Sequence, residues 1–339
     1  MENLLEIQKK FIPQAIELME KRYSILRQIS ISEPVGRRNL ANIMGITERI
    51  VRSEIEFLKE QGLINVDISG MTVTEEGTKI LDDLKNIMND IMGLSNLQEK
   101  VRKKLGIKKV LLVPGSYDEN NSLIKDVARC GAEYFLSILR DGDTVSITGG
   151  NTMLEFANNI KTDKKYHNVT VVPARGSMGK DLEIQSNNVV ATTSKKLNSN
   201  YKLLNLPDEL GDEAMKTIIQ EPEIKNTLDF INKTNILVFG IGKADEMAKK
   251  RRIQEEKLED IIKKGGVGEA FGHYFNQDGE IVCKLNTVAI DLDTFKDIKE
   301  NIAIFAGVKK VDALIAMTKI NKNFVLVTDE ASANEILRR

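Results

Sequence analysis

The chain has 339 residues, of which 41% are hydrophobic and 29% charged, with a formal net charge of −1. This composition indicates a globular protein of two or three domains and excludes an overall basic, nucleic-acid-binding surface. Two histidines and two distant cysteines exclude a histidine-rich metal site and a disulfide framework. No apolar run approaches the roughly 18–20 residues that span a bilayer, and the N-terminus lacks a signal-peptide pattern. We therefore expect a cytoplasmic protein that does not associate with membranes.

The first 78 residues predict a winged helix-turn-helix domain. Helix, turn, helix and β-hairpin follow one another in the order typical of that fold. A threonine before the second short helix is a suitable N-cap, and the apolar positions of the helices recur with helical spacing. The expected elements are helices over Ile12–Gln28 and Arg37–Met44, a turn at Gly45, a helix capped by Thr47 that extends over 50–61, and a hairpin of Ile64–Ile68 with Met71–Thr74.

One helix of this domain carries the residues expected to contact DNA. Arg49 and Arg52 are three positions apart, so they project from one side of the helix toward a groove. Other arginines are candidates for phosphate contacts. A module for protein interaction or oligomerisation is the alternative. The expected DNA contacts are Thr47, Glu48, Arg49, Arg52 and Ser53 on the helix, Arg37 and Arg38 before it, and further phosphate contacts from Arg22 and Arg27.

Residues 79–106 predict a helical linker. Apolar residues recur at steps of three and four from Ile80 to Leu105, the spacing of a helix able to pair with its copy in a second subunit. A helix packed on its own domain is the alternative, and Gly93 in the middle of the pattern favours it. Because helix-turn-helix domains usually bind two half-sites as pairs, we expect a homodimer or homotetramer.

Residues 107–339 predict an α/β domain. Apolar runs with the length of strands alternate with helical patterns, which indicates a mostly parallel sheet covered on both faces. In such sheets ligands bind beyond the carboxyl ends of the strands. The expected strands are Lys109–Val113, Thr144–Thr148, Val169–Pro173, Asn235–Gly240, Val311–Ala316 and Phe324–Thr328, and the expected helices cover Ser122–Arg140, a segment from Thr152, Met247–Lys264, Asp297–Phe305 and Ala331–Leu337.

Polar and glycine-rich segments follow several of these strands. Gly149 and Gly150 lead into Asn151 and Thr152, where a helix begins whose free N–H groups favour an anion. Ala174–Ser177 and Gly240–Lys243, which leads into the basic run Lys249–Arg252, also follow strands. Two further segments are a flexible loop at Gly265–Gly272 and Ala306–Lys310, which lies just before the expected strand Val311–Ala316. Together they suit an anionic, hydroxylated ligand. The alternatives are an ordinary turn, a structural ion pair for Arg175 and a solvated helix face for the basic run.

Several motifs carry a family resemblance. The winged helix together with ITGGNTM, VPARGSMG, VFGIGKADEMAKKRR, GEAFGHYFNQDGE, VKKVDALIA and VLVTDEASA resembles the SorC family of sugar-responsive bacterial repressors. The resemblance covers nearly the full length. It implies a domain similar to sugar-phosphate isomerases and deaminases without their catalysis, and oligomeric binding to operator DNA of glycolytic genes. It also implies fructose-1,6-bisphosphate, or a related sugar phosphate, as effector, with no cofactor and no metal.

The resemblance also implies an effector site. Gly150, Asn151 and Thr152, preceded by Gly149, resemble a phosphate cradle. Further contacts are implied for Arg175, Gln185, Glu269 and Lys310, and for one basic residue that either Lys250 or Arg251 provides. The competing hypothesis is a sugar-phosphate isomerase or deaminase fused to a DNA-binding domain. Such chemistry needs a base beside the substrate, and Glu269 and Asp245 are the candidates.

Overall fold

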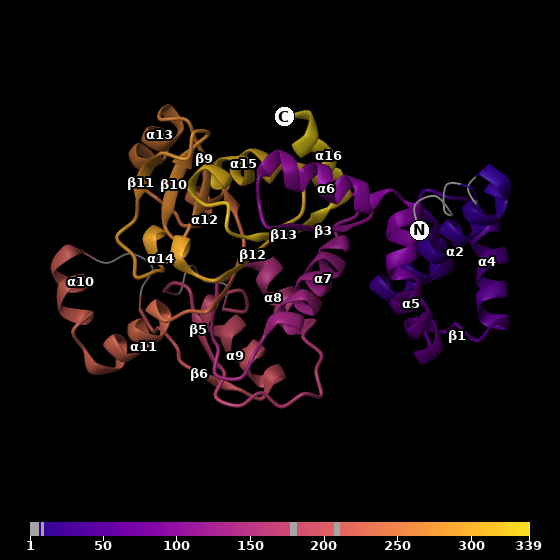
Figure 1. Ribbon diagram of the computed structural model, residues 1–339, viewed down its shortest axis with the longest axis horizontal. Helices are drawn as coiled ribbons and strands as arrows, with labels where there is room; N and C mark the ends of the chain where they lie inside the picture. The colour runs from indigo at the N-terminus through magenta and orange to yellow at the C-terminus, as the bar shows by residue number, and fades with distance from the viewer. Residues whose placement is uncertain (1–6, 8–9, 177–181, 207–210) are drawn as a thin grey trace. The chain divides into compact units, whose positions relative to one another are not determined.

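The computed structural model describes residues 7, 10–176, 182–206 and 211–339 (Figure 1). The chain divides after Leu97 into two compact units, which we describe separately. Within the described ranges, no helix combines the length and the apolar character that a membrane crossing requires.

The first unit consists of helices closed by a β-hairpin, in the expected order. Gly45, with φ of 62°, makes the turn between the two short helices. The hydroxyl of Thr47 accepts the N–H of Ile50 at 3.4 Å and caps the second of them, as predicted. Ile25, Ile29, Leu40, Val51 and Met88 are among the side chains that form the core. The elements are α2 (Pro13–Ser32), α3 (Arg37–Met44), α4 (Glu48–Glu60), β1 (Ile64–Asp67), β2 (Gly70–Val73) and α5 (Glu75–Ile91).

The interval 79–106 does not form one continuous helix. It contains the end of α5 and all of α6 (Leu94–Leu105), and the two helices are separated at Gly93, whose φ of 73° is unsuited to a helix. Leu81, Met88 and Ile91 of α5 are buried in the core of the first unit. One side of α5 therefore packs on its own domain, whereas Ile87 of the predicted seam is 50% exposed. The expectation of one continuous helix was wrong, and pairing with a second subunit stays a prediction.

The second unit is built on a seven-stranded sheet, and the predicted parallel arrangement of the strands is confirmed. The strand order is β3-β13-β12-β7-β4-β5-β6, and every neighbouring pair is parallel. In Figure 1, α7 and α8 lie on one face of this sheet and α15 and α16 on the other. The strands are β3 (Lys109–Val113), β4 (Thr144–Ile147), β5 (Thr170–Pro173), β6 (Asn200–Tyr201), β7 (Ile236–Phe239), β12 (Glu300–Ile304) and β13 (Val325–Asp329).

The remaining elements cover this sheet or extend it. A second, antiparallel sheet has the order β11-β10-β9-β8. Its strands are β8 (Gly242–Lys243), β9 (Gly266–Ala270), β10 (His273–Asn276) and β11 (Ile281–Lys284). The helices are α7 (Leu123–Ile138), α8 (Asn151–Asn158), α9 (Ser186–Leu197), α10 (Asp212–Ile218), α11 (Pro222–Asn232), α12 (Ala244–Lys250), α13 (Glu255–Lys263), α14 (Leu292–Asp297), the 3₁₀ turn η1 (Val308–Lys310), α15 (Val311–Ile320) and α16 (Glu330–Arg338).

Four predicted elements of this unit were wrong. Asp297–Phe305 is not a helix: its centre is β12, a strand buried on both faces, so apolar residues do not alternate along it. Val311–Ala316 is not a strand but the first part of α15, whose largely buried surface hides the helical period. The loop predicted at Gly265–Gly272 is mostly strand β9. The predicted helix Met247–Lys264 is two helices, α12 and α13.

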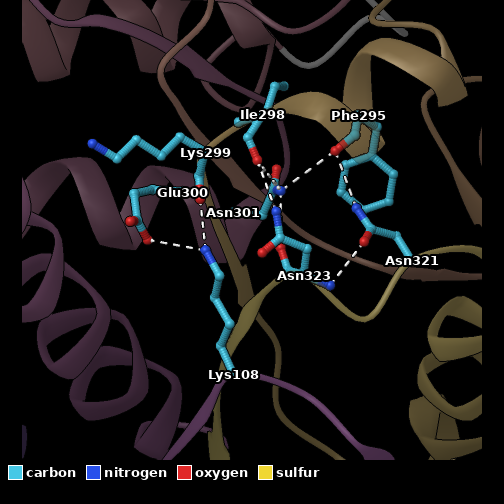
Figure 2. Close-up of polar contacts among 8 residues, drawn as sticks. All are labelled: Lys108, Phe295, Ile298, Lys299, Glu300, Asn301, Asn321 and Asn323. Carbon is cyan, nitrogen blue, oxygen red and sulfur yellow. Dashed lines mark hydrogen bonds and ion pairs between the residues drawn. The ribbon is translucent and has the colours of Figure 1, made fainter.

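Side-chain amides hold the amino end of β12 in place. Figure 2 shows the buried amide nitrogen of Asn301 donating to the carbonyls of Ile298 and Asn323, at 3.1 and 2.9 Å. The ammonium of Lys108 donates to the carbonyl of Lys299 at 2.6 Å. These bonds tie β12 to the segments before β3 and β13. They fix the position of the strand whose opposite, carboxyl end leads into the loop that contains Lys310.

Candidate functional site

One cavity of about 970 Å³ opens at the carboxyl ends of the central strands of the parallel sheet. Each loop that borders it follows a strand, as the rule for parallel sheets predicts. All ten residues expected at an effector site line it: Gly149, Gly150, Asn151, Thr152, Arg175, Gln185, Lys250, Arg251, Glu269 and Lys310. Ser177, which one of the motifs contains, lies outside the described residues.

The first group of lining residues forms the N-terminus of α8. A Cβ on Gly149 would lie 2.6 Å from the carbonyl oxygen of Ile184, so only glycine allows segment 184–186 to pass this closely. Gly150 has a φ of 114° and donates its own N–H to Ile184 at 2.8 Å. Gly150 therefore shapes the turn, and the next N–H groups, of Asn151 and Thr152, belong to the first turn of α8, where helix N–H groups can bind an anion.

The second group is a buried cluster of charges. Oε1 of Glu269 lies 2.6 Å from a guanidinium nitrogen of Arg251 and 3.4 Å from one of Arg175, and it accepts the N–H of Gly272 at 2.8 Å. All three charged side chains are more than nine-tenths buried. Burial raises the pKa of the Glu269 carboxyl, and the charge of Arg175 and the N–H of Gly272 oppose that shift. Two arginines and one carboxylate leave this end of the cavity cationic.

The structure separates the members of the basic run. Arg251 follows α12 directly, and its side chain is buried against Glu269. Lys250 also lines the cavity but is exposed at its rim. Lys249 and Arg252 are exposed and do not line the cavity. Of the two candidates that the sequence left open, Arg251 is thus the one whose guanidinium points inward.

Lys310 lies on η1, beyond the carboxyl end of β12. Its loop was predicted to precede a strand, whereas it follows one, and this brings Lys310 to the same edge as Thr152. Burial lowers the pKa of the Lys310 ammonium, and the negative charge of Glu246 opposes this. Tyr117 and Asp118 also line the cavity and were missed. Their position directly after β3 was the signal that could have identified them.

The residues expected to contact DNA lie on the first unit. Arg37, Arg38, Glu48, Arg49, Arg52 and Ser53 are exposed, and Thr47 caps α4. Arg38 lies 3.7 Å from Glu48, so the two helices share a charged surface. Arg22 is less suited to a phosphate contact, because its guanidinium donates to Glu54 at 2.9 Å and lies 3.4 Å from the ring centre of Phe57.

Comparison with known proteins gives matches over both units. Residues 89–338 match the family model described as "Putative sugar-binding domain", and residues 18–88 match "CggR N-terminal DNA binding domain". The central glycolytic genes regulator of Priestia megaterium is 39% identical over 339 residues, which are 100% of this chain and 99% of that protein. The protein of the same name from Bacillus subtilis is 38% identical over 338 residues, with the same coverage.

Solved structures match the fold as well. A structure described as "putative SorC family transcriptional regulator from Enterococcus faecalis" has a TM-score of 0.66 and 30% identity, and the match covers 71% of this chain and 99% of that one. The full-length sorbitol operon regulator SorC from Klebsiella pneumoniae also has a TM-score of 0.66, over 96% of this chain and 99% of that one. Its identity is 17%, so this likeness concerns the fold alone.

Proposed function

The chain belongs to the SorC family of sugar-binding transcriptional regulators, and on that premise we propose that it represses glycolytic genes under the control of fructose-1,6-bisphosphate. Its relatives and structural neighbours are transcriptional regulators, so this protein is a regulator and not an enzyme. The two bases considered for an enzyme already have partners: Glu269 binds two arginines, and Asp245 lies 3.2 Å from the ammonium of Lys243.

The observation that carries the effector proposal is that groups suited to an anion line the cavity in two sets, one at the N-terminus of α8 and one at the buried arginines. One phosphate would lie at the N–H groups of Asn151 and Thr152, with the ammonium of Lys310 beside it. The other would lie at the guanidiniums of Arg175 and Arg251, with Lys250 at the rim. An uncompensated dianion at a buried surface is costly, so a bisphosphate needs cations or N–H groups at both ends. Gln185 and Glu269 would bind the sugar hydroxyl groups that lie between the two phosphates.

The strand order supports this arrangement. Only β7 separates β12, whose carboxyl end leads to Lys310 on η1, from β4, which leads into α8. Two strand spacings are about 10 Å, a distance that a lysine side chain and a phosphate bridge together. Arg175 follows β5, on the other side of β4. The Lys310 end and the Arg175 end therefore lie on opposite sides of the α8 N-terminus.

The first unit would bind the operator as a winged helix-turn-helix. The order α3, Gly45 turn, α4 and β1–β2 hairpin supports this proposal, and so does the exposure of Arg49 and Arg52 on one side of α4. In this arrangement α4 contacts base edges, and Arg37 and Arg38 contact phosphates. Two half-sites require a homodimer or homotetramer.

The test is a titration of promoter-region DNA from glycolytic genes with the full-length protein. Fluorescence anisotropy is measured without ligand and with fructose-1,6-bisphosphate, fructose 6-phosphate, glucose 6-phosphate or inorganic phosphate. A change in DNA affinity that is largest for fructose-1,6-bisphosphate is expected, because an effector acts through a difference in affinity between two states. DNA binding that none of these compounds alters would contradict the proposed effector class.

A further inference from the structure

Asp329 is a fully buried carboxylate at the carboxyl end of β13 and holds the N-cap position of α16. An aspartate at this position normally accepts an N–H of the first turn of its own helix. Here it accepts none of them. Oδ1 accepts the N–H of Gly307 and Oδ2 the N–H of Tyr117, each at 3.1 Å, and the hydroxyl of Ser332 donates to Oδ1 at 2.5 Å. The carboxylate thus joins the loops after β12 and β3.

A second carboxylate holds the same loop from the other side. Asp118 accepts the N–H of Val308 at 2.9 Å. Two successive N–H groups of the turn that leads to Lys310 are therefore bound by two carboxylates. Gly307 itself has a φ of 101°, which favours glycine, and a Cβ there would lie 3.1 Å from the ring of Tyr117. The position of this turn is determined by its surroundings rather than by its own sequence.

This arrangement decides how the turn can bind an anion. Successive N–H groups ahead of a helical turn are often an anion site. Because Asp329 and Asp118 already occupy those of Gly307 and Val308, the turn binds an anion in the cavity through its lysine side chains, of which Lys310 is half-buried and Lys309 is exposed. The Lys310 side chain therefore extends from a backbone turn that the carboxylates of Asp329 and Asp118 hold in place.

We propose that Asp329, together with Asp118, is a positioning residue that holds the Lys310 ammonium beside the α8 N-terminus for a phosphate group of the ligand. The inference rests on the proposed function. The local rule that an N-cap aspartate caps its own helix is broken here, and such departures are expected where a residue serves a site instead.

The test is a double-mutant cycle on the full-length protein with fructose-1,6-bisphosphate as the calorimetric probe. Lys310→Met should weaken binding about tenfold or more. Asp329→Asn replaces one acceptor oxygen with an NH₂ that faces an N–H donor, so it should weaken binding about fivefold to tenfold. In the Lys310→Met background, Asp329→Asn should have little further effect, because its role is exerted through the lysine. Asp118→Asn should behave in the same way and serves if Asp329→Asn does not fold.

The matched control is Glu330→Gln. Glu330 is the next residue and also accepts a backbone N–H, that of Gly115 at 3.0 Å, but it does not hold the Lys310 turn. Its replacement should leave binding unchanged. The inference is overturned if Lys310→Met weakens binding while Asp329→Asn and Asp118→Asn do not, or if Asp329→Asn causes the same loss with and without Lys310. Wild-type protein that binds no fructose-1,6-bisphosphate would instead overturn the proposed function, and the inference with it.

Discussion

Replacing Arg175 with alanine should abolish most of the preference for a sugar bisphosphate over a monophosphate. Its guanidinium is 7% exposed and, in the proposed arrangement, binds the phosphate that the N-terminus of α8 does not bind. A charge-assisted hydrogen bond in such a place contributes about 1.5–3 kcal/mol, which corresponds to a loss of about 10-fold to 150-fold in the affinity for fructose-1,6-bisphosphate. A monophosphate held at Asn151 and Thr152 does not reach Arg175, so its affinity should change by less than about threefold.

The fold should tolerate this change. Glu269 keeps Arg251 at 2.6 Å and the N–H of Gly272 at 2.8 Å, so the buried carboxylate is not left without partners. We expect a loss of about 1–3 kcal/mol in the free energy of unfolding. Calorimetry with fructose-1,6-bisphosphate, fructose 1-phosphate and fructose 6-phosphate measures the affinities, and thermal unfolding without ligand measures the stability. DNA binding should persist while the response to the sugar is reduced.

Arg252→Ala is the control, because Arg252 is an exposed arginine beside Arg251 that does not line the cavity. It should leave both affinities unchanged. Equal losses for the bisphosphate and for the monophosphates in Arg175→Ala would refute the two-ended arrangement. So would an Arg175→Ala protein that retains the full preference for the bisphosphate.

Three further predictions concern DNA binding, pH dependence and stability. Arg49→Ala and Arg52→Ala should each weaken operator binding by about 1–3 kcal/mol and relax the sequence preference. The control Lys59→Ala, at the far end of α4, should have neither effect. Anisotropy titrations that show no loss in the Arg49→Ala, Arg52→Ala double mutant would exclude α4 as the recognition helix. Because burial lowers the pKa of Lys310 and a bound phosphate favours its ammonium, binding should take up a proton, and affinity should fall as pH rises through the lowered pKa. Calorimetry at several pH values should show this fall flattened in Lys310→Met, and an unchanged slope would contradict it. Asn301→Asp replaces an amide that donates to two backbone carbonyls with a buried carboxylate that can only accept, so it should lower the free energy of unfolding, measured in urea, by at least about 2 kcal/mol. An unchanged urea midpoint would show that the hydrogen bonds of the Asn301 amide do not hold β12.

Local patterns were sufficient where a residue's role depends on its neighbours in the chain. Thr47 before an amphipathic run predicted the cap of α4, and the alternation of strands with helices predicted the parallel sheet. They failed where burial is uniform. The strand β12 is buried on both faces and the helix α15 over most of its surface, so neither a period of 2 nor one of 3.6 is visible in their sequences.

The ten residues expected at the site all line the cavity, and most of them lie in loops that follow strands of the parallel sheet, whose carboxyl ends meet at one edge. Only the tertiary structure decided how their side chains are arranged. Arg251 rather than Lys250 points into the cavity, because its guanidinium forms an ion pair with the carboxylate of Glu269. Glu269 lies on β9, a strand that was predicted to be a loop. The packing of α5 on its own unit depends on residues far apart in the chain, and so does the hydrogen bond that Asp329 accepts from the N–H of Gly307. No local pattern encodes such contacts, since they form only when the packed elements bring those residues together.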